Sequence, residues 1–358
     1  MLLPTTFPEP ELFTPGSDAP ALRWGVLAPG WIADLFVSAV HEHTDQRIVA
    51  VASRSAERAR SFSARHGIAK AYDSYEQLVA DPEVDVVYIA APQSEHLALG
   101  LLAIAAGKHT LVEKPMATTA DEARVLVAAA RSAGVLLMEA LWSRYLPQTS
   151  VVRALVRDGV LGDIRSVAAD HGQAIPDYPH HRLHRRELGG GALLDLGIYP
   201  VQLDSMVLGA PTSITAIGGL LDTGVDAYST LVLGHGPSVQ STLTTTLVVR
   251  TPSTAVIAGT AARLEMAGSF YMPTTLRLAD NDGNALVWND PTGVTSMAGL
   301  SWEATALARF VGQGRTQSPV HTLDETVSIL ETLDEARRQL DDAASGPARP
   351  DEYVRGAA

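Results

Sequence analysis

The chain has 358 residues, no cysteine and a formal net charge of -13 at pH 7. Its length exceeds the size at which one hydrophobic core stops growing, so we expect two domains, and its acidic balance disfavours a nucleic-acid partner. The absence of cysteine excludes disulfides, thiolate catalysis and zinc–cysteine or iron–sulfur sites, and it fits the cytoplasmic location that we expect.

Residues 1–22 form a proline-rich leader, with Pro4, Pro8, Pro10, Pro15 and Pro20. Proline removes a backbone donor and blocks helix, so we expect an extended segment. Chain ends fray by default, which favours a loose leader over an arm that clasps a second subunit. No apolar run is long enough to span a bilayer and no signal peptide is evident, so we expect no membrane partner.

Residues 23–146 alternate short apolar runs with helix-like segments. The apolar runs cover residues 23–28, 48–52, 84–91, 110–112 and 136–138. Runs that are apolar on every side predict parallel strands buried on both faces, joined by crossover helices. We therefore predict an α/β domain with a doubly wound parallel sheet of the Rossmann type.

A turn directly after the first predicted strand reads Ala28-Pro29-Gly30-Trp31-Ile32-Ala33, in the place of G-x-G-x-x-G/A. Such a turn lets the backbone approach a pyrophosphate at a helix N-terminus, where free N–H groups and the helix dipole favour an anion. Gly30 is the close-approach residue, and Ala28 replaces the usual first glycine. We predict dinucleotide binding at Ala28, Gly30, Trp31 and Ile32, although Pro-Gly turns without a ligand are common.

Ser53 and Arg54 follow the second predicted strand, where a site that prefers NAD usually carries Asp or Glu. Ser53 can donate a hydrogen bond to a 2′-phosphate, Arg54 can pair with it, and Arg58 lies one helical turn further on. This pattern predicts NADP as the cofactor, with NAD as the alternative. A pair of solvated arginines without a ligand is the other interpretation.

The segment Glu113-Lys114-Pro115 follows a later strand at its carboxyl end, where open α/β sheets bind ligands. A lysine in this crevice lies near the nicotinamide, and its charge can hydrogen-bond the reacting oxygen. Glu113 can hold the ammonium and Pro115 can stiffen the turn. Position alone is equally compatible with a surface lysine.

Residues 189–200 read GGGALLDLGIYP. Three glycines let the backbone run close to a ligand or another chain. Asp195 and Tyr199 are four residues apart, so they share a helix face. A tyrosine beside a lysine can exchange a proton with a substrate hydroxyl while the cofactor carries the hydride. The alternative is a core tyrosine with a satisfied hydroxyl.

Two further groups of residues stand out. Trp142 and Arg144 leave the last strand of the first domain, where they can wall the nicotinamide or the substrate, and core packing is an equal alternative for Trp142. The histidines at 180, 181 and 184 have loose spacing, which favours a polar loop over a metal site, so we expect no metal (His180, His181, His184).

The pattern changes after Pro147. A helix is predicted over residues 149–157, and β-branched runs that alternate in polarity beyond Gly209 predict an antiparallel sheet. A last helix is predicted over residues 322–340. Residues 147–358 are therefore expected to form a substrate-binding α+β domain, whose C-terminal helix can pack back on the first domain.

With these segments in order, the chain resembles the Gfo/Idh/MocA family of oxidoreductases over nearly its whole length from Arg23. The resemblance depends on the phosphate turn, on Ala91-Pro92 with His96, on Glu113-Lys114-Pro115 and on GGGALLDLGIYPV. Within the family, MEALWSRYLP and RELGGGALLDLGIYPV are most similar to the subgroup of dimeric dihydrodiol dehydrogenase and NADP-dependent D-xylose dehydrogenase.

The resemblance implies an N-terminal Rossmann domain and a C-terminal domain whose open sheet forms a homodimer or homotetramer contact. It implies Lys114 and Tyr199 as the catalytic pair, with Asp195 near the substrate. It places further residues around the cofactor, namely Pro92, His96, Glu113, Trp142 and Arg144. Two departures stand out, because Ala28 replaces a glycine and DHGQAIPDYPHHRLH lacks the aromatic pattern of the subgroup, which points to looser cofactor binding and a different substrate.

The sequence thus predicts an NADP-dependent enzyme that transfers a hydride between the nicotinamide and a CH–OH or C=O carbon of a small sugar or sugar-like diol. A ketoreductase of nucleotide-linked sugars is the alternative, and it needs a second diphosphate site, for which the candidates are Arg182, Arg185 and Arg186. A non-catalytic homologue that senses NADP is a third hypothesis, against which the retention of both Lys114 and Tyr199 argues.

Overall fold

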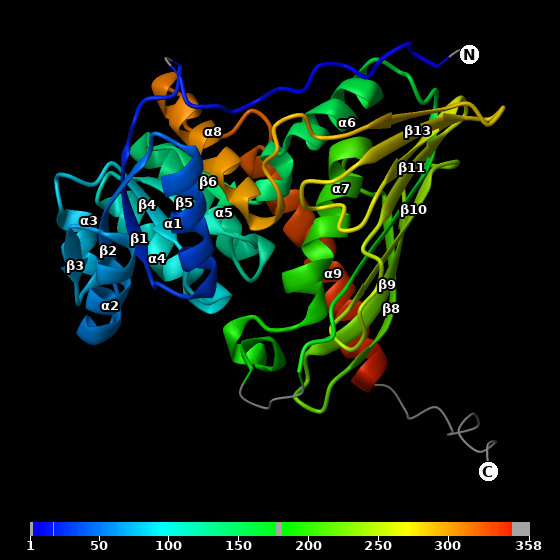
Figure 1. Ribbon diagram of the computed structural model, residues 1–358. Helices are drawn as coiled ribbons and strands as arrows, with labels where there is room; N and C mark the ends of the chain where they lie inside the picture. Colours follow the sequence, from blue (N-terminus) through cyan, green and yellow to red (C-terminus); the bar gives the residue numbers. More distant parts are fainter. Residues whose placement is uncertain (1–2, 17, 177–180, 346–358) are drawn as a thin grey trace.

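A parallel sheet of six strands forms the first domain, in the order β3-β2-β1-β4-β5-β6 (Figure 1). The structure is a computed structural model that describes residues 3–16, 18–176 and 181–345. The strands are β1 (Arg23–Leu27), β2 (Arg47–Ala52), β3 (Lys70–Tyr72), β4 (Val86–Ile89), β5 (His109–Glu113) and β6 (Leu137–Ala140). The helices are α1 (Trp31–His43), α2 (Ala56–His66), α3 (Tyr75–Ala80), α4 (His96–Ala105) and α5 (Ala120–Ala133). The predicted doubly wound Rossmann sheet is confirmed.

The centre of this sheet is buried on both faces. β1 pairs with β2 and β4, so that Val26 lies between Val51 and Tyr88, and all three are fully buried. This burial explains why the central strands appear in the sequence as continuous apolar runs. The sequence pattern does not predict β3, because its three residues are not buried and form no apolar run.

The second sheet has eight strands in the order β14-β13-β12-β11-β7-β10-β9-β8. β7 and β10 are parallel and the other neighbouring pairs are antiparallel, which confirms the predicted mainly antiparallel sheet. The strands are β7 (Ile164–Gly172), β8 (Ser213–Leu220), β9 (Asp226–Gly234), β10 (Gln240–Thr246), β11 (Ala255–Gly259), β12 (Ala262–Met266), β13 (Leu276–Asp280) and β14 (Ala285–Trp288). The remaining helices are α6 (Pro147–Arg157), α7 (Ile198–Leu208), α8 (Leu300–Gly312) and α9 (Leu323–Ser345).

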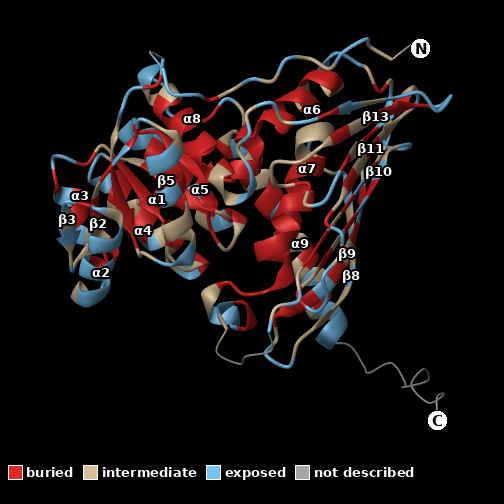
Figure 2. Ribbon diagram, viewed as in Figure 1, coloured by how far each residue is buried: buried red, intermediate tan, exposed pale blue. Residues whose placement is uncertain are grey.

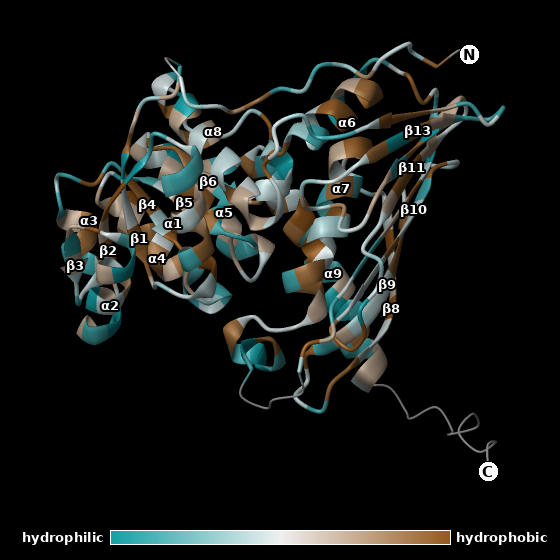
Figure 3. Ribbon diagram, viewed as in Figure 1, coloured by the Kyte–Doolittle hydropathy of each residue, from teal (hydrophilic) through white to brown (hydrophobic). Residues whose placement is uncertain are grey.

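Within the part of the chain that the structure describes, helices cover one face of the second sheet and leave the other open. Helices α7 and α9 pack on its inner face, and α7 is hydrophobic and buried over its first two turns (Figures 2 and 3). The opposite face, called the open face below, exposes Ile217, Tyr228, Val232 and Val287. Buried and exposed residues alternate along much of β9, as expected for a sheet with one solvated face.

Two C-terminal helices connect the domains. Helix α8 packs on α1 of the first domain. Helix α9 packs on α5, where Asp334 accepts a hydrogen bond from the Ala120 N–H at 2.8 Å. Its other end contacts β8, where Gln339 donates to the Ile214 carbonyl at 2.9 Å. The C-terminal helix therefore packs back on the first domain while it also supports the second sheet. Among the described residues, no helix combines the length and the apolarity needed to cross a bilayer.

The leader is extended but not loose. Its described residues run along α8 and α6 (Figure 1), and Phe13 is buried between the rings of Tyr145 and Phe310, with centroid distances of 6.0 and 5.7 Å. The Glu11 N–H donates to Ser150 at 2.9 Å. The expectation of a frayed leader is therefore wrong for residues 3–16 and 18–22, because one buried aromatic side chain and several polar contacts hold the segment on its own chain.

Candidate active site

The phosphate turn has an open helix end. Gly30 precedes α1, and in the described chain no side chain caps this helix. The first intrahelical hydrogen bond runs from the Asp34 N–H to the Gly30 carbonyl, so the preceding N–H groups point out of the helix end. A Cβ atom on Gly30 would meet only the Ala28 carbonyl, at 3.9 Å. These features leave room for an anionic group at the turn.

Ala28 adopts the backbone conformation of the glycine that it replaces. Its φ is +59°, in the left-handed region that disfavours residues with a Cβ atom. Its N–H donates to the Ala52 carbonyl of β2 at 3.0 Å. The turn thus keeps the glycine-type geometry with an alanine in place, and Trp31 beside it is 74% exposed.

The end of β2 carries a cation and no carboxylate. Ser53 is buried, and its Oγ accepts the Ser55 N–H at 3.2 Å. The Arg54 side chain is 74% exposed, and 3.8 Å separates it from the Glu95 carboxylate. An ion pair this long and exposed contributes little, so the guanidinium is available to a ligand. Arg58 is exposed one turn into α2.

His96 connects two loops at the crevice. Its ring is fully buried, with Nδ1 2.8 Å from the Pro115 carbonyl and Nε2 3.0 Å from the Ala91 carbonyl. Burial lowers the pKa of His96, while the two carbonyl acceptors oppose that shift. His96 therefore connects the loop of Pro92 to the turn of Lys114.

Lys114 lies between the two domains. Its Nζ donates to the Asp195 carbonyl at 2.7 Å and to the Asp195 carboxylate at 3.2 Å. Arg182 donates to the same carboxylate at 3.0 Å. Burial opposes the ionisation of Asp195, but the charges of Lys114 and Arg182 outweigh it and hold the pKa of Asp195 well below its ordinary value. Asp195 is therefore an ionised anchor for two cations.

The expectation that Glu113 holds the ammonium is wrong. One Glu113 oxygen accepts the Tyr88 hydroxyl at 2.6 Å, and the other accepts the backbone N–H of Lys114 at 3.1 Å. The carboxylate thus fixes the main chain under Lys114, while the side chain of Lys114 extends to Asp195, which is 81 residues away in sequence.

Tyr199 is the second member of the predicted pair, and it lies beside the first. The Lys114 Nζ is 5.1 Å from the centroid of the Tyr199 ring. The Trp142 indole donates to the Tyr199 hydroxyl at 3.0 Å. Burial raises the pKa of Tyr199 well above its ordinary value. Because the hydroxyl accepts from Trp142, and no described residue accepts its hydrogen, the phenol is poised to donate a proton.

His171 and Tyr271 complete an aromatic wall that sequence reasoning missed. The ring centroids of Tyr271 lie 4.6 Å from Tyr199 and 4.2 Å from His171. Burial lowers the pKa of His171 to about 4, so the ring is neutral. His171 is the penultimate residue of β7, and its place near the end of a strand was the signal that could have identified it. Tyr271 lies in a loop after β12, and no sequence pattern marks it.

The structure separates Trp142 from Arg144. Trp142 contacts Tyr199, as described above. Arg144 is 1% exposed and directed into the interior, where it donates to Glu325 at 2.5 Å and to the Gln202 carbonyl at 2.7 Å. Arg144 therefore does not wall the crevice, because its own side chain is enclosed and is bound to Glu325 and Gln202.

The candidate diphosphate cluster is neutralised by carboxylates. Arg182 binds Asp195, Arg185 binds Glu187 at 2.7 Å, and Arg186 binds Asp341 at 2.5 Å. His181 and His184 lie with ring centroids 5.8 Å apart, and His180 lies outside the described residues. Over the described ranges, no group of three or more His, Cys, Asp or Glu residues could hold a metal ion.

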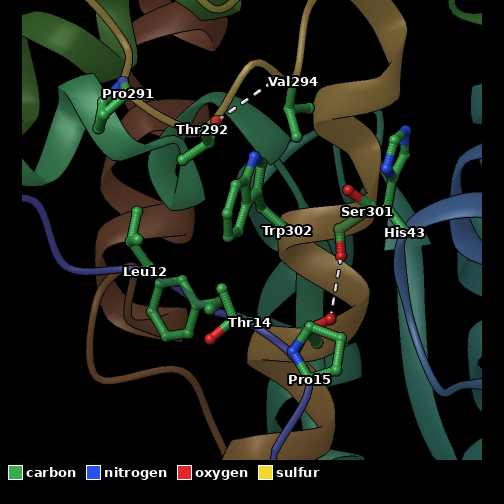
Figure 4. Close-up of a pocket in the computed structure, with 11 residues that line it drawn as sticks. Leu12, Thr14, Pro15, His43, Pro291, Thr292, Val294, Ser301 and Trp302 are labelled. Atoms are coloured by element: carbon green, nitrogen blue, oxygen red, sulfur yellow. Dashed lines mark hydrogen bonds between the residues drawn. The ribbon is translucent and has the colours of Figure 1, made fainter.

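A cavity of about 430 Å³ lies away from this site, between the leader, the end of α1 and α8 (Figure 4). Leu12, Phe13, Val294 and Trp302 supply much of its apolar lining, and His43 marks the end of α1 that is remote from the phosphate turn. Neither Lys114 nor Tyr199 lines this cavity, so it is separate from the candidate active site.

Comparison with known proteins matches this geometry. Residues 22–141 match the oxidoreductase family model Gfo/Idh/MocA with an NAD-binding Rossmann fold, and residues 149–265 match the C-terminal domain model of that family. The chain is 35% identical over 326 residues to trans-1,2-dihydrobenzene-1,2-diol dehydrogenase of Xenopus tropicalis, which covers 89% of this chain and 98% of that protein. The same enzyme of Homo sapiens is 36% identical, covering 89% of this chain and 97% of its own length.

A solved structure of a 3-ketoreductase from Actinomadura kijaniata, in complex with NADP and TDP-benzene, is also similar. Its TM-score is 0.76 at 28% identity, covering 89% of this chain and 98% of that one. The chain therefore belongs to the Gfo/Idh/MocA family, as its motifs predicted, and is an oxidoreductase that uses a nicotinamide cofactor.

Proposed function

We propose that the protein is an NADP-dependent oxidoreductase that transfers a hydride between the nicotinamide and a CH–OH or C=O carbon of a sugar or sugar-like diol. The observation that carries this proposal is the meeting of the Lys114 ammonium and the Tyr199 phenol, 5.1 Å from Nζ to the ring centroid, beside Asp195. The similarity to dihydrodiol dehydrogenases supports chemistry at an alcohol carbon.

The residues at the end of β2 suit NADP. The open α1 terminus fits a pyrophosphate, and the exposed Arg54, whose ion pair with Glu95 is long at 3.8 Å, fits a 2′-phosphate. The similar 3-ketoreductase was solved with NADP. Gly30, Ile32 and Arg54 would hold the dinucleotide in this proposal.

In the proposed reaction the bound nicotinamide supplies or takes up the hydride. For reduction, Tyr199 donates its hydroxyl proton to the substrate oxygen, since Trp142 leaves that hydrogen unused. Two Lys114 donors bind Asp195, so the third can stabilise the developing oxyanion. Oxidation runs the same step in reverse, so that the substrate alcohol passes its proton to Tyr199 after the phenol has released its own.

A ketoreductase of nucleotide-linked sugars is the second candidate. It is favoured by the similar enzyme solved with TDP-benzene. Against it stand Arg182, Arg185 and Arg186, because each is already paired with a carboxylate. A free sugar or diol fits this arrangement better than a diphosphate does.

The two candidates separate in one assay. Purified protein is mixed with NADP or NADPH, and the absorbance of the reduced nicotinamide is followed across aldoses, keto-sugars, cyclic diols and a TDP-linked keto-sugar. We expect turnover with an unsubstituted sugar or diol and at least about tenfold preference for NADP over NAD. Turnover confined to the TDP-linked substrate would replace the first candidate by the second, and no turnover with any substrate would refute both.

We also propose that the open face joins two copies into a homodimer, or a homotetramer built on it, in the cytoplasm. Ile217, Tyr228 and Val232 expose apolar surface on the neighbouring strands β8 and β9, and Val287 exposes more on β14 at the opposite edge of the sheet. Exposed apolar patches mark contact surfaces. The cysteine-free sequence suits a reducing compartment. Light scattering during gel filtration tests the assembly, because Ile217→Lys should shift the mass towards that of one chain.

A further inference from the structure

Behind the catalytic pair, polar side chains that are buried except for the partly exposed Glu325 form a continuous path that the mechanism above does not use. It starts at Glu139 on β6, whose Oε1 accepts the Met116 N–H at 2.8 Å. Met116 lies two residues after Lys114, so this hydrogen bond holds the turn that carries the ammonium. The other Glu139 oxygen is 2.8 Å from the His321 Nε2 and accepts the Thr326 hydroxyl at 2.9 Å.

The path continues through the start of α9 into the second domain. His321 Nδ1 lies 3.4 Å from the Glu325 carboxylate, and Arg144 donates to the other Glu325 oxygen at 2.5 Å. Arg144 also donates to the carbonyl and to the side chain of Gln202. Gln202 belongs to α7, three residues after Tyr199. The path thus begins beside Lys114 and ends one helical turn from Tyr199.

We infer that Glu139, His321, Glu325 and Arg144 are positioning residues that fix the turn of Lys114 relative to the helix of Tyr199. This inference rests on the proposed function, because it assumes that the two side chains act together. None of the four touches the reacting groups; they act through the Met116 N–H at one end and through Gln202 at the other.

The burial of the path supports this assignment. Glu139, Arg144 and His321 are each 2% exposed or less. Burial opposes the ionisation of Glu139, but the hydrogen bonds from His321, Met116 and Thr326 outweigh it and lower the pKa of Glu139. Groups this buried can change position only with their partners, because an unpaired buried charge is strongly unfavourable. A displacement of either end is therefore resisted along the whole path.

The same molecule offers a matched control. Asp204 on α7 is 3.0 Å from His235 and accepts the Ser241 hydroxyl, and this Asp–His pair is also buried. Its partners follow β9 and lie on β10, so it stays within the second domain. Loss of the control pair should lower stability without loosening the turn of Lys114.

The experiment compares His321→Asn with His235→Asn in the full chain. We expect His321→Asn to lower kcat by about 10- to 100-fold, since small misplacements of reacting groups have effects of this size, while the KM values stay within about twofold. Hydrogen–deuterium exchange without cofactor should become faster both in residues 114–118 and in residues 195–202. His235→Asn should lower the melting temperature and leave kcat and exchange at 114–118 unchanged.

Two milder variants cover the case in which His321→Asn fails to fold. Glu139→Gln keeps the shape of the side chain, and Thr326→Val removes one hydrogen bond to Glu139; each should give the same exchange pattern with a smaller loss of kcat. Combining either with His321→Asn should add little, because all three act on one path.

The outcomes are distinct. Exchange that rises only near residues 321–326, or a kcat loss no larger than that of His235→Asn, would overturn the inference. A wild-type protein without turnover on the substrate panel would instead refute the proposed function, and the exchange data would still decide whether the path couples the two segments.

Discussion

The cofactor side and the catalytic side of the site are built in different ways. At the proposed cofactor side, Trp31 and the Arg54 side chain are both 74% exposed, and the proposed recognition elements are backbone N–H groups and a solvated cation. At the catalytic side, Tyr199 is 6% exposed, and Trp142, Lys114 and Asp195 contact it or one another. Substitutions should therefore have small, separable effects on the cofactor side and large, coupled effects on the catalytic side.

The largest expected effect tests the catalytic side. Tyr199→Phe removes the proton donor and keeps the ring, so we expect turnover to fall by about 10²- to 10⁴-fold while the Kd for NADP stays within about twofold. Single-turnover kinetics and NADPH fluorescence titration measure the two quantities. Tyr228→Phe on the open face is the control. Unchanged turnover would remove Tyr199 from the mechanism.

The second effect concerns the pH dependence of stability, through Asp226, which binds the helical turn that precedes Tyr199. Asp226 accepts the Leu193 N–H at 2.6 Å, and burial raises its pKa to about 6. The folded state then binds more protons than the unfolded state between pH 4 and 6, so this group lowers the unfolding free energy by about 2–3 kcal/mol as pH rises through that window. Asp226→Asn keeps an acceptor and should remove this slope in urea titrations.

The exposed Asp222 supplies the control for that measurement, because Asp222→Asn should leave the slope unchanged. If the unfolding free energies of wild type and Asp226→Asn run parallel from pH 4 to 6, the pKa of Asp226 is not raised in the folded state. The prediction would then be wrong.

The third effect lies on the cofactor side. Arg54→Ala should weaken NADP binding by about tenfold and leave NAD binding unchanged, since only NADP carries the 2′-phosphate that Arg54 can pair with. Calorimetric titration with both cofactors measures this, with Arg60→Ala, an exposed position on the following helix α2, as the control. Equal weakening of NADP and NAD would mean that Arg54 does not select between them.

The smallest effect compares two alanines of the phosphate turn. Ala28→Gly relieves a left-handed backbone at φ +59° but frees the unfolded chain, so the unfolding free energy should rise by less than about 1 kcal/mol. Ala33→Gly, in the regular helix α1, should lower it by about 1 kcal/mol. If Ala28→Gly lowers the unfolding free energy as Ala33→Gly does, the Ala28 backbone is not strained.

The sequence was informative where local pattern decides the structure. Buried strands appear as apolar runs, so β1, β2 and β4 could be predicted, and Lys114 stood out because it follows a strand at the ligand-binding edge. The partners of the site residues could not be predicted, because they depend on how the domains dock. Asp195 rather than Glu113 binds Lys114, and Arg144 is directed inward to Glu325, 181 residues away.

The leader sets a limit on how the chain can be shortened for expression. Phe13 fills the space against Tyr145, which belongs to the same short helix as Trp142, the indole that holds the Tyr199 hydroxyl. A fusion partner attached before Leu12 leaves the Phe13 side chain in position. A cut beyond Phe13 would leave a void beside Tyr145 and Phe310, and it would loosen the short helix whose Trp142 donates to the Tyr199 hydroxyl.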